Sequence, residues 1–473
     1  MVFSSLSFLC VFLPAVLVLY RLMPSLRAKN VLLMVASLVF YAYGEPVYVL
    51  LMVVSALLNY SWALLLRSCG DSKGRSRGVM AIAIAQNLGV LCVFKYAGFL
   101  VETLNGVAGL AIPVPQIALP IGISFFTFQA MSYVIDVYRG EVAAERNFVR
   151  ILLYISLFPQ LIAGPIVKYH DIAHELSERV QTRDGFTKGL RRFIIGLSKK
   201  VLVANCMAQV ADALFDAPMT EIGTVAAWVG AAAYALQIYF DFSGYSDMAI
   251  GIGWMFGFHF KENFNRPYVS TSVRGFWRRW HISLSTWFRD YLYIPLGGNR
   301  KGPGRAAANR IIVFFLCGLW HGASWTFVFW GLYHGVFLLL EQYVPFFSRN
   351  GGTGPDASLA RRAFGHVYLI VVVLVGWVFF RAGTIEQGFA WVGAMFGVCS
   401  PDPSSAALLL AQLTPLNITV FAVGCVCSLP VLDRLRDRPA LQRASWAICI
   451  VLLALCLLSL ATGTYNPFIY FRF

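Results

Sequence analysis

Long apolar blocks with few charges, several of them close to twenty residues, recur along the whole chain. Backbone polar groups in hydrocarbon need internal partners, and no alternating ten-residue pattern suggests a barrel, so these blocks predict helices. A helix needs roughly 20 apolar residues to cross a bilayer. We predict an all-α, polytopic membrane protein with roughly ten to twelve transmembrane helices in a single domain, residues 1–473. The blocks lie near 6–23, 31–43, 47–66, 79–100, 148–166, 224–257, 311–340, 365–380, 415–431 and 445–461.

The composition agrees with a membrane protein and argues against a nucleic-acid partner. Hydrophobic residues make up 58% of 473 positions and charged residues only 13%, whereas a soluble domain is about half apolar and about a quarter charged. The net charge of +15 comes from basic residues that cluster between the apolar blocks. Because cytoplasmic loops of membrane proteins carry an excess of Lys and Arg, this charge indicates membrane orientation instead of nucleic-acid binding.

The basic loops also predict which side each loop occupies. The first block lacks a positive leader and a cleavage site, so we expect a permanent span and not a signal peptide. Basic residues follow the first and third spans, which places both loops in the cytoplasm and the N-terminus outside. Whether 311–340 is one tilted helix or a broken, re-entrant pair stays open. The other loops are expected to be cytoplasmic at 168–200, 261–310 and 433–443 and external at 400–414, with the C-terminus outside.

The ten cysteines do not form a recognisable metal site or disulfide framework. Most of them, such as Cys10, Cys92 and Cys317, stand singly inside apolar blocks, and no His spacing completes a zinc site. Since free cysteines are commonly buried, we expect packing roles and no bound metal.

Two carboxylates interrupt the apolar block at 224–257. Asp241 and Asp247 are separated by about 600° on a helix, so they face different sides and do not form a glycosidase-like pair. Ionisable groups at membrane depth are costly and usually face a cavity. Each is predicted either to pair with a basic group between helices or to bind substrate directly.

The segment RGFWRRWHISLSTWFRDYLYIPLGG, residues 274–298, alternates basic and aromatic side chains. This pattern is typical of a helix lying flat in the membrane interface, where it would hold His281 beside a cavity. His281 is then either a structural hydrogen-bonding residue or part of the chemistry. The adjoining glycine-rich loop carries Arg300, Lys301 and Arg305, which suit a phosphate, although it has no Walker or dinucleotide motif and a solvated basic loop is the alternative.

A second histidine lies in the apolar segment FFLCGLWHGASWTFVFWGLYHG, residues 314–335. Gly318 and Gly322 leave room beside His321 for a substrate chain or a close helix. In apolar surroundings a histidine stays neutral, which a general base requires, although a hydrogen-bonded core residue is the alternative. His334 lies about 220° further around the helix, so it is predicted to be structural.

These segments together resemble the membrane-bound O-acyltransferase family, most of all the branch of bacterial membrane subunits of alginate O-acetylation. The resemblance runs from MVFSSLSFL at the N-terminus, through LPIGISFFTFQAMSYVIDVYRG and FPQLIAGPI, to YFDFSGYSDMAIG, the WRRWH and WHG motifs and the closing NPFIYFRF. It implies a ring of membrane helices around a central funnel. It also implies transfer of an acyl group from a thioester to a hydroxyl.

The resemblance assigns roles to individual residues. His321 of the WHG motif corresponds to the family's catalytic histidine, and His281 to the second histidine associated with the site. Asp241, Asp247 and Trp320 are expected to contribute to substrate binding, with Arg300, Lys301 and Arg305 holding the phosphates of acetyl-CoA. Neutral His321 would accept the hydroxyl proton during attack, while His281 either stabilises the oxyanion or orients His321.

The implied setting is a bacterial inner membrane, with acetyl-CoA as the donor substrate and no further cofactor. The implied partners are a polysaccharide acceptor outside and periplasmic proteins that complete the transfer. The acceptor is alginate or, alternatively, peptidoglycan, cellulose or another exopolysaccharide, and D-alanyl transfer toward teichoic acid is a further possibility. A transporter or flippase with an Asp241–Asp247 proton relay is the alternative from another class, but it predicts inverted repeats between the halves, which the sequence lacks.

Overall fold

Helices are the regular secondary structure of the chain wherever the computed structural model describes it, over residues 1–344, 358–398, 405–431, 439–463 and 465–469, and no strand occurs in these ranges. It divides into two compact units. The first unit comprises Met1–Phe193 and Tyr245–Lys261, and the second comprises Ile194–Gly244 and Glu262–Phe473. Helices α10 (Arg183–Ser198) and α12 (Thr224–Phe256) contribute residues to both units. The all-α prediction is confirmed.

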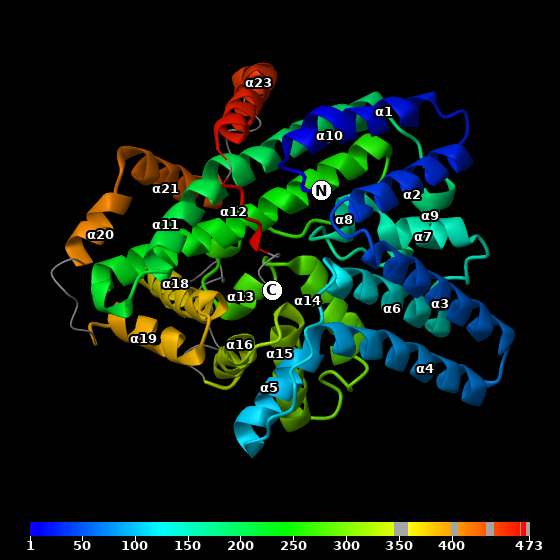
Figure 1. The fold of residues 1–473 in the computed structure, drawn as a ribbon, viewed down its shortest axis with the longest axis horizontal. Coiled ribbons are helices and arrows are strands. Elements are labelled where there is room, and N and C mark those ends of the chain that lie inside the picture. The colour runs from blue at the N-terminus through cyan, green and yellow to red at the C-terminus, as the bar shows by residue number, and fades with distance from the viewer. Residues whose placement is uncertain (345–357, 399–404, 432–438, 464, 470–473) are drawn as a thin grey trace. The chain divides into compact units, whose positions relative to one another are not determined.

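In the first unit, α6 is buried along most of its length and packs against α3 and α4 (Figure 1). A buried amide pair joins α3 to α4, because Asn59 and Asn87 each donate a side-chain hydrogen bond to the other, at 3.0 and 2.8 Å. Such polar pairs hold helices together where lipid offers no hydrophobic driving force. The elements are η1 Phe8–Phe12, α1 Leu13–Leu22, α2 Leu26–Ala42, α3 Tyr48–Ser68, α4 Lys73–Leu91, η2 Cys92–Tyr96, α5 Ala97–Ala108, α6 Ile123–Arg139, α7 Phe148–Ser156, α8 Phe158–Leu161 and α9 Tyr169–Ser177.

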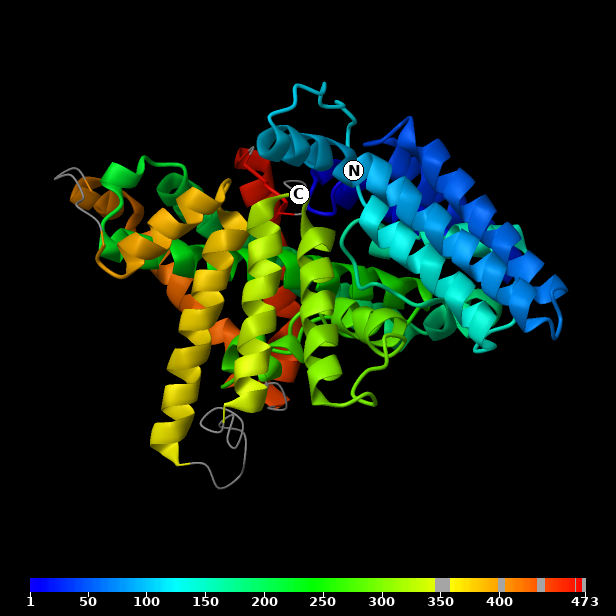
Figure 2. The same ribbon diagram turned by 90° about the horizontal axis from the view of Figure 1, so that it is seen from below.

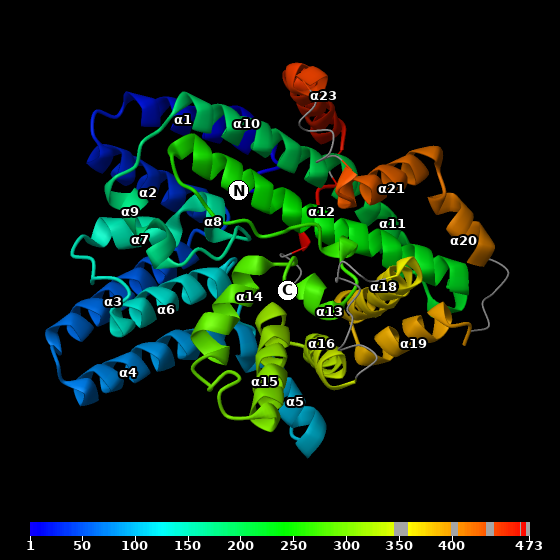
Figure 3. The same cartoon turned by 180° about the vertical axis from the view of Figure 1, so that it is seen from behind.

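In the second unit, α15, α16 and α18 stand side by side (Figure 2), and α20 and α21 lie along α11 (Figure 3). Short helices from α13 to η6 precede α15 and pack on this layer. The elements are η3 Lys199–Ala204, α11 Asn205–Phe215, η4 Met219–Glu221, η5 Pro267–Val269, α13 Val273–Trp277, α14 Ile282–Phe288, η6 Arg289–Tyr293, α15 Pro303–His321, α16 Trp325–Tyr343, α18 Leu359–Arg381, α19 Ile385–Met395, α20 Ser405–Gln412, α21 Pro415–Ser428 and α23 Pro439–Thr462.

Six helices in the described part of the chain are long and apolar enough to cross a membrane, or seven if the bent pair α20–α21 is one span. The number is below the ten to twelve predicted, because several apolar blocks are divided among shorter helices; block 148–166, for example, holds α7 and α8. The spans confirm a multi-pass membrane protein. Most side chains of the predicted loop 433–443, and the start of segment 400–414, lie outside the described residues.

The segment 311–340 is a broken pair and not one tilted helix. Helix α15 ends at His321, and α16 begins at Trp325 and packs against it. Glycines allow this close approach: a Cβ on Gly318 would lie 2.3 Å from the Phe327 carbonyl oxygen, and one on Gly331 would lie 2.2 Å from that of Phe314. The prediction that Gly318 makes room for a neighbouring helix is confirmed, and His321 is thereby fixed at a helix end.

The segment 274–298 does not form the single interfacial helix predicted from its pattern. It breaks between α13 and α14, where His281 adopts a left-handed backbone conformation with φ 43°. Because such a conformation is strained for a residue with a Cβ, it occurs mainly where surrounding contacts enforce it, often at active sites.

Candidate active site

His321 faces a small, enclosed space walled by aromatic rings. The cavity measures about 10 Å³, roughly the size of one water molecule, and we call it the histidine chamber. The ring of His321 meets those of Trp330 and Phe380 edge to face, at centroid distances of 5.1 and 5.2 Å. These contacts hold the imidazole in one orientation. The chamber is also bordered by Phe242, Trp280, Trp377 and Ile469.

The second histidine, His281, is fully buried and fixed by Asn263. Its Nδ1 lies 3.1 Å from Asn263 Oδ1, which also accepts hydrogen bonds from the backbone N–H and hydroxyl of Ser283. Since the Ser283 backbone N–H can only donate, this oxygen is an acceptor, so His281 Nδ1 carries the proton. The Asn263 carbonyl accepts from Ile282 N at 2.9 Å and so holds the strained turn.

This arrangement sets the protonation state of His281. Burial lowers the pKa of His281 to about 3, so the ring is neutral at physiological pH. With the proton on Nδ1, the opposite nitrogen Nε2 carries a lone pair and acts as an acceptor. Two roles were predicted for His281: donating a hydrogen bond to the oxyanion or orienting His321. Because Nε2 of this tautomer can only accept a hydrogen bond, the tautomer favours the orienting role.

The two histidine rings lie close to one another and share an aromatic neighbour. Their centroids are 6.4 Å apart, and Trp320 contacts both, at 6.0 Å from His281 and 5.0 Å from His321. Phe242, which borders the chamber, packs at right angles to His281 at 4.6 Å. The two histidines therefore lie in one aromatic cluster, in which His321 borders the chamber and His281 lies next to it.

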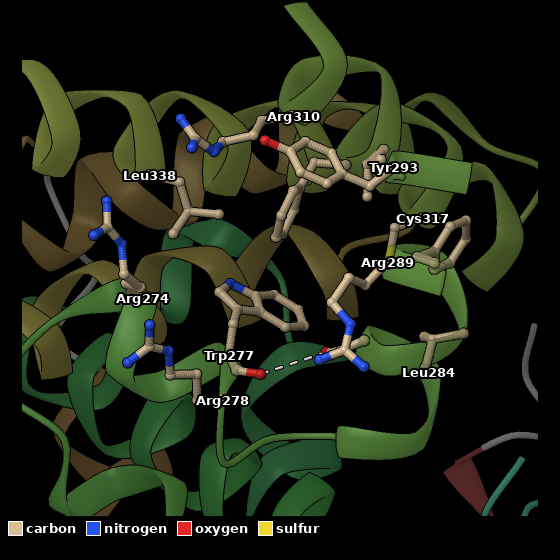
Figure 4. Close-up of a pocket in the computed structure, with 13 residues that line it drawn as sticks. Arg274, Trp277, Arg278, Leu284, Arg289, Tyr293, Arg310, Cys317 and Leu338 are labelled. Atoms are coloured by element: carbon tan, nitrogen blue, oxygen red, sulfur yellow. Dashed lines mark hydrogen bonds between the residues drawn. The ribbon is translucent and has the colours of Figure 1, made fainter. Parts of the chain in front are cut away.

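A larger cavity of about 250 Å³ opens beside the chamber, and we call it the arginine cavity. Figure 4 shows four arginines around the indole of Trp277. Phe314, Leu338 and other apolar side chains form the remaining walls. The cavity thus combines apolar walls with cationic groups that suit phosphate. The arginines are Arg274, Arg278, Arg289 and Arg310.

Two residues connect the arginine cavity with the chamber. Cys317 borders the cavity and lies one turn before His321 on the same face of α15. Trp277, another wall residue, contacts Trp330 at 5.6 Å, and Trp330 borders the chamber. A ligand in the arginine cavity is therefore separated from His321 by little more than these side chains.

Comparison with known proteins identifies the family of this chain. The model of the membrane-bound O-acyltransferase family matches residues 141–380. A probable alginate O-acetylase of Azotobacter vinelandii is 43% identical over 430 residues, covering 90% of this chain and 84% of the relative. The chain belongs to the membrane-bound O-acyltransferase family. Another probable alginate O-acetylase, from Pseudomonas putida, is 39% identical over the full length of both chains, and a peptidoglycan O-acetyltransferase of Helicobacter pylori is 35% identical over 84% of this chain and 80% of its own.

The basic loop predicted to bind the donor lies away from the arginine cavity of this acyltransferase. Arg300, Lys301 and Arg305 are exposed in and just after the turn between η6 and α15, and none of them borders the cavity among the described residues. The four arginines that do border it were not among the predicted site residues. Their spacing in the sequence could have indicated a shared site. Arg274 and Arg278 are one helical turn apart. Arg310, Phe314, Cys317 and His321 repeat along one face of α15.

The two carboxylates of α12 each form an ion pair in the O-acyltransferase. Asp241 lies 2.7 Å from Lys200 in the second unit, and both side chains are almost completely buried. Asp247 accepts two hydrogen bonds from Arg192, at 3.0 and 2.8 Å, in the first unit. Between the two alternatives, this geometry favours pairing with basic groups.

His334 does not border the chamber; it packs against Trp277 and Trp330, each at a centroid distance of 5.2 Å. A Cβ on Gly376 would come within 2.7 Å of its ring, so the packing is tight. This position agrees with the structural role predicted for His334.

One group in the first unit brings a histidine to carboxylates. His170 Nδ1 lies 2.9 Å from Asp136 Oδ2 and 3.8 Å from a Glu141 oxygen, and its Nε2 lies 3.2 Å from Asp171. His170, Asp136 and Glu141 carry an imidazole and two carboxylates, which are able to hold a divalent metal. The 2.9 Å separation is nevertheless a hydrogen-bond distance, so the geometry is that of an imidazole hydrogen-bonded to a carboxylate.

Proposed function

We propose that this enzyme transfers an acetyl group from acetyl-CoA during O-acetylation of an extracellular polysaccharide, with alginate as the first candidate. The observation that carries the proposal is buried His321 at a water-sized chamber, with the buried ring of His281 6.4 Å away and the arginine cavity close by. Thioester acyl transfer needs a base for the attacking hydroxyl, a water-poor site and a grip on the donor phosphates. The names of the alginate O-acetylase relatives supply the acceptor class.

In this proposal His321 acts as the general base. The acceptor oxygen attacks the thioester carbonyl as its proton passes to His321, and collapse of the tetrahedral intermediate expels the thiolate, which takes up that proton. The products are an acetyl ester and free coenzyme A. His281 Nε2 serves as a second acceptor that aligns the hydroxyl group or the His321 ring, and Trp320 supports both rings.

The size of the chamber supports a short acyl group. A cavity of about 10 Å³ between Trp330, Trp377 and Phe380 leaves no room for a long acyl chain. The arginine cavity, at about 250 Å³, is within reach of the ~300–1,000 Å³ of typical small-molecule sites and can take part of coenzyme A. Acetyl-CoA is a substrate here, and the proposed chemistry calls for no further cofactor.

We place the enzyme in a bacterial inner membrane, with the arginine cavity toward the cytoplasm, where acetyl-CoA is made. The positive-inside distribution of loop charges supports this orientation, with both termini on the periplasmic side. The acceptor polymer lies outside, so the acetyl group has to cross the membrane. Periplasmic partner proteins would then complete its transfer to the polymer.

Peptidoglycan is the second candidate acceptor, because a peptidoglycan O-acetyltransferase is 35% identical over most of the chain. Teichoic acid D-alanyltransferases are less similar; one from Bacillus subtilis is 27% identical over 47% of this chain. Membership of an acyltransferase family leaves the transporter alternative without support.

Complementation is expected to distinguish the acceptors. We expect the chain, expressed in an alginate-producing strain that lacks its own membrane O-acetylase, to restore base-labile acetate on alginate. In a strain that lacks its own peptidoglycan O-acetyltransferase, we expect the chain to restore no base-labile acetate on peptidoglycan. Acetate released by mild alkali from each purified polymer gives the measurement. The reverse pattern would make peptidoglycan the acceptor.

The donor site is tested by comparing two sets of basic residues. Changing Arg274 and Arg278 together to Gln should raise the KM for acetyl-CoA several-fold to about thirtyfold, since each partly solvated charge contributes modestly. We expect kcat to change little, because these groups bind ground and transition states alike. Initial rates against acetyl-CoA concentration in nanodiscs provide the measurement.

The matched control changes Arg300, Lys301 and Arg305 to Gln, which removes more charge from the exposed loop. We expect this variant to raise the KM less than the cavity variant does. A larger effect from the loop would place the donor phosphates there, as the sequence pattern suggested, and would remove the arginine cavity from the donor site.

A further inference from the structure

The segment Asn466–Ile469 contributes a wall residue to the histidine chamber. Ile469 borders the chamber together with His321. Phe468 and Ile469 are only 5% and 2% exposed, although the segment lies outside the long helices. A buried segment of this kind requires contacts that hold it in place.

The ion pair between Lys200 and Asp241 provides these contacts. Asp241 Oδ1 pairs with Lys200 Nζ at 2.7 Å, while Asp241 Oδ2 accepts the backbone N–H of Ile469 at 2.8 Å. Lys200 Nζ also donates to the backbone carbonyl of Pro467. Both members of the pair therefore bind the segment and each other. Asn205 adds a side-chain hydrogen bond to Asn466 at 3.3 Å.

Energetics favour a role beyond helix packing for this pair. Burying two charges costs several kcal/mol per ion, and an apolar pair of similar volume is often as stable. An extended segment in the interior, however, leaves its backbone N–H and C=O groups without the partners that a helix or sheet supplies. The carboxylate and the ammonium of this pair satisfy one group of each kind.

We propose that Lys200 and Asp241 form a latch that seats the segment Asn466–Ile469 as one wall of the histidine chamber, and that acetyl transfer depends on the seated segment. The activity part rests on the proposed acetyl transfer, whereas the latch itself rests on the contacts alone. Lys200 and Asp241 are then positioning residues. Because Ile469 closes a water-sized chamber, release of the segment would admit water and favour hydrolysis of the thioester over transfer.

The direct test measures whether the segment is seated. Phe468→Cys places a thiol at a buried position, and mass spectrometry of the modified peptide reports its labelling by a small thiol reagent in native membranes. Adding Asp241→Asn, which keeps the shape but weakens the latch, is expected to speed labelling at least tenfold. Asp136→Asn, which changes another buried carboxylate, paired with His170 in the first unit, is the matched control and should leave labelling unchanged.

Charge reversal separates the latch from simple pairing. Lys200→Asp combined with Asp241→Lys restores an ion pair, but the new carboxylate cannot donate to Pro467 and the new ammonium cannot accept from Ile469. We expect fast labelling of the Phe468→Cys thiol in this background. Slow labelling in either latch variant, at normal membrane abundance, would overturn the proposal and leave the pair a role in helix packing alone.

The activity arm uses the ratio of acetyl-CoA hydrolysis to acetyl transfer. We expect Asp241→Asn, and a chain that ends at Gly463, to raise this ratio at least tenfold. Asp136→Asn should leave it near the wild-type value. Fast labelling with an unchanged ratio would keep the latch and remove its role in transfer. If the wild-type chain transfers no acetyl group, the proposed function fails, whereas the labelling result still decides the latch.

Discussion

Replacing His321 with Ala is expected to abolish O-acetylation of the polymer while the protein remains in the membrane at normal abundance. Removing a general base typically costs about 10²–10⁴-fold in rate, and a neighbouring histidine does not compensate unless it reaches the same proton. We expect a loss of about a thousandfold or more in kcat, measured as acetyl transfer in nanodiscs at saturating acetyl-CoA.

His334→Ala is the matched control for this variant. His334 is also buried between tryptophans of the same layer, at a centroid distance of 5.2 Å from Trp330, but it does not border the chamber. Removing the His334 side chain should lower the thermal stability of the protein, because it leaves a cavity in the packed layer. The folded fraction should retain most of its acetyl transfer activity. Polymer that stays acetylated with well-expressed His321→Ala would exclude His321 as the base.

The helical fold could be predicted from the sequence because membrane helices are encoded locally. Long apolar blocks with few charges predict spans without any knowledge of tertiary contacts. The candidate spans among the described residues are fewer than the ten to twelve predicted, because length and hydropathy do not show where a block breaks. Residues 311–340 illustrate this point, since Gly322–Ser324 separate α15 from α16 inside one apolar stretch.

The site was only partly predictable, because a local sequence pattern does not show which distant side chains meet in the fold. His281 and His321 lie in distinctive motifs, and their closeness followed from the family resemblance. The role of Asn263 could not be predicted, because its side chain meets His281 through a turn whose left-handed conformation the sequence pattern conceals. The latch was equally hidden: Lys200, Asp241 and Ile469 are far apart in sequence, and no local pattern connects them.

Asn263 is expected to control the protonation of His281, which makes it the second residue with a large effect. Asn263→Ala leaves His281 Nδ1 and the Ser283 groups without their common acceptor, and unsatisfied buried groups cost about 1–3 kcal/mol each. If the strained turn relaxes, the His281 ring moves away from His321. We expect kcat to fall roughly a hundredfold with a small change in KM.

Asn263→Asp gives the more specific result, because it keeps the acceptor and adds a negative charge beside Nδ1. In the wild type the pKa of His281 is lowered to about 3 by burial, so the ring is neutral across the physiological range. A carboxylate at position 263 favours the protonated imidazolium and raises that pKa. Below the raised pKa, Nε2 is protonated and cannot accept, so activity should fall on the acid side at a higher pH than in the wild type.

The measurement is the pH dependence of kcat for wild type and Asn263→Asp in nanodiscs. Asn309→Ala is the matched control, because Asn309 is another fully buried amide, hydrogen-bonded to the Gly298 carbonyl at 3.1 Å and away from both histidines. It should lower stability without moving the acid limb. Superimposable profiles for wild type and Asn263→Asp would show that His281 does not need to be neutral during transfer, and would limit it to holding the turn that carries α14.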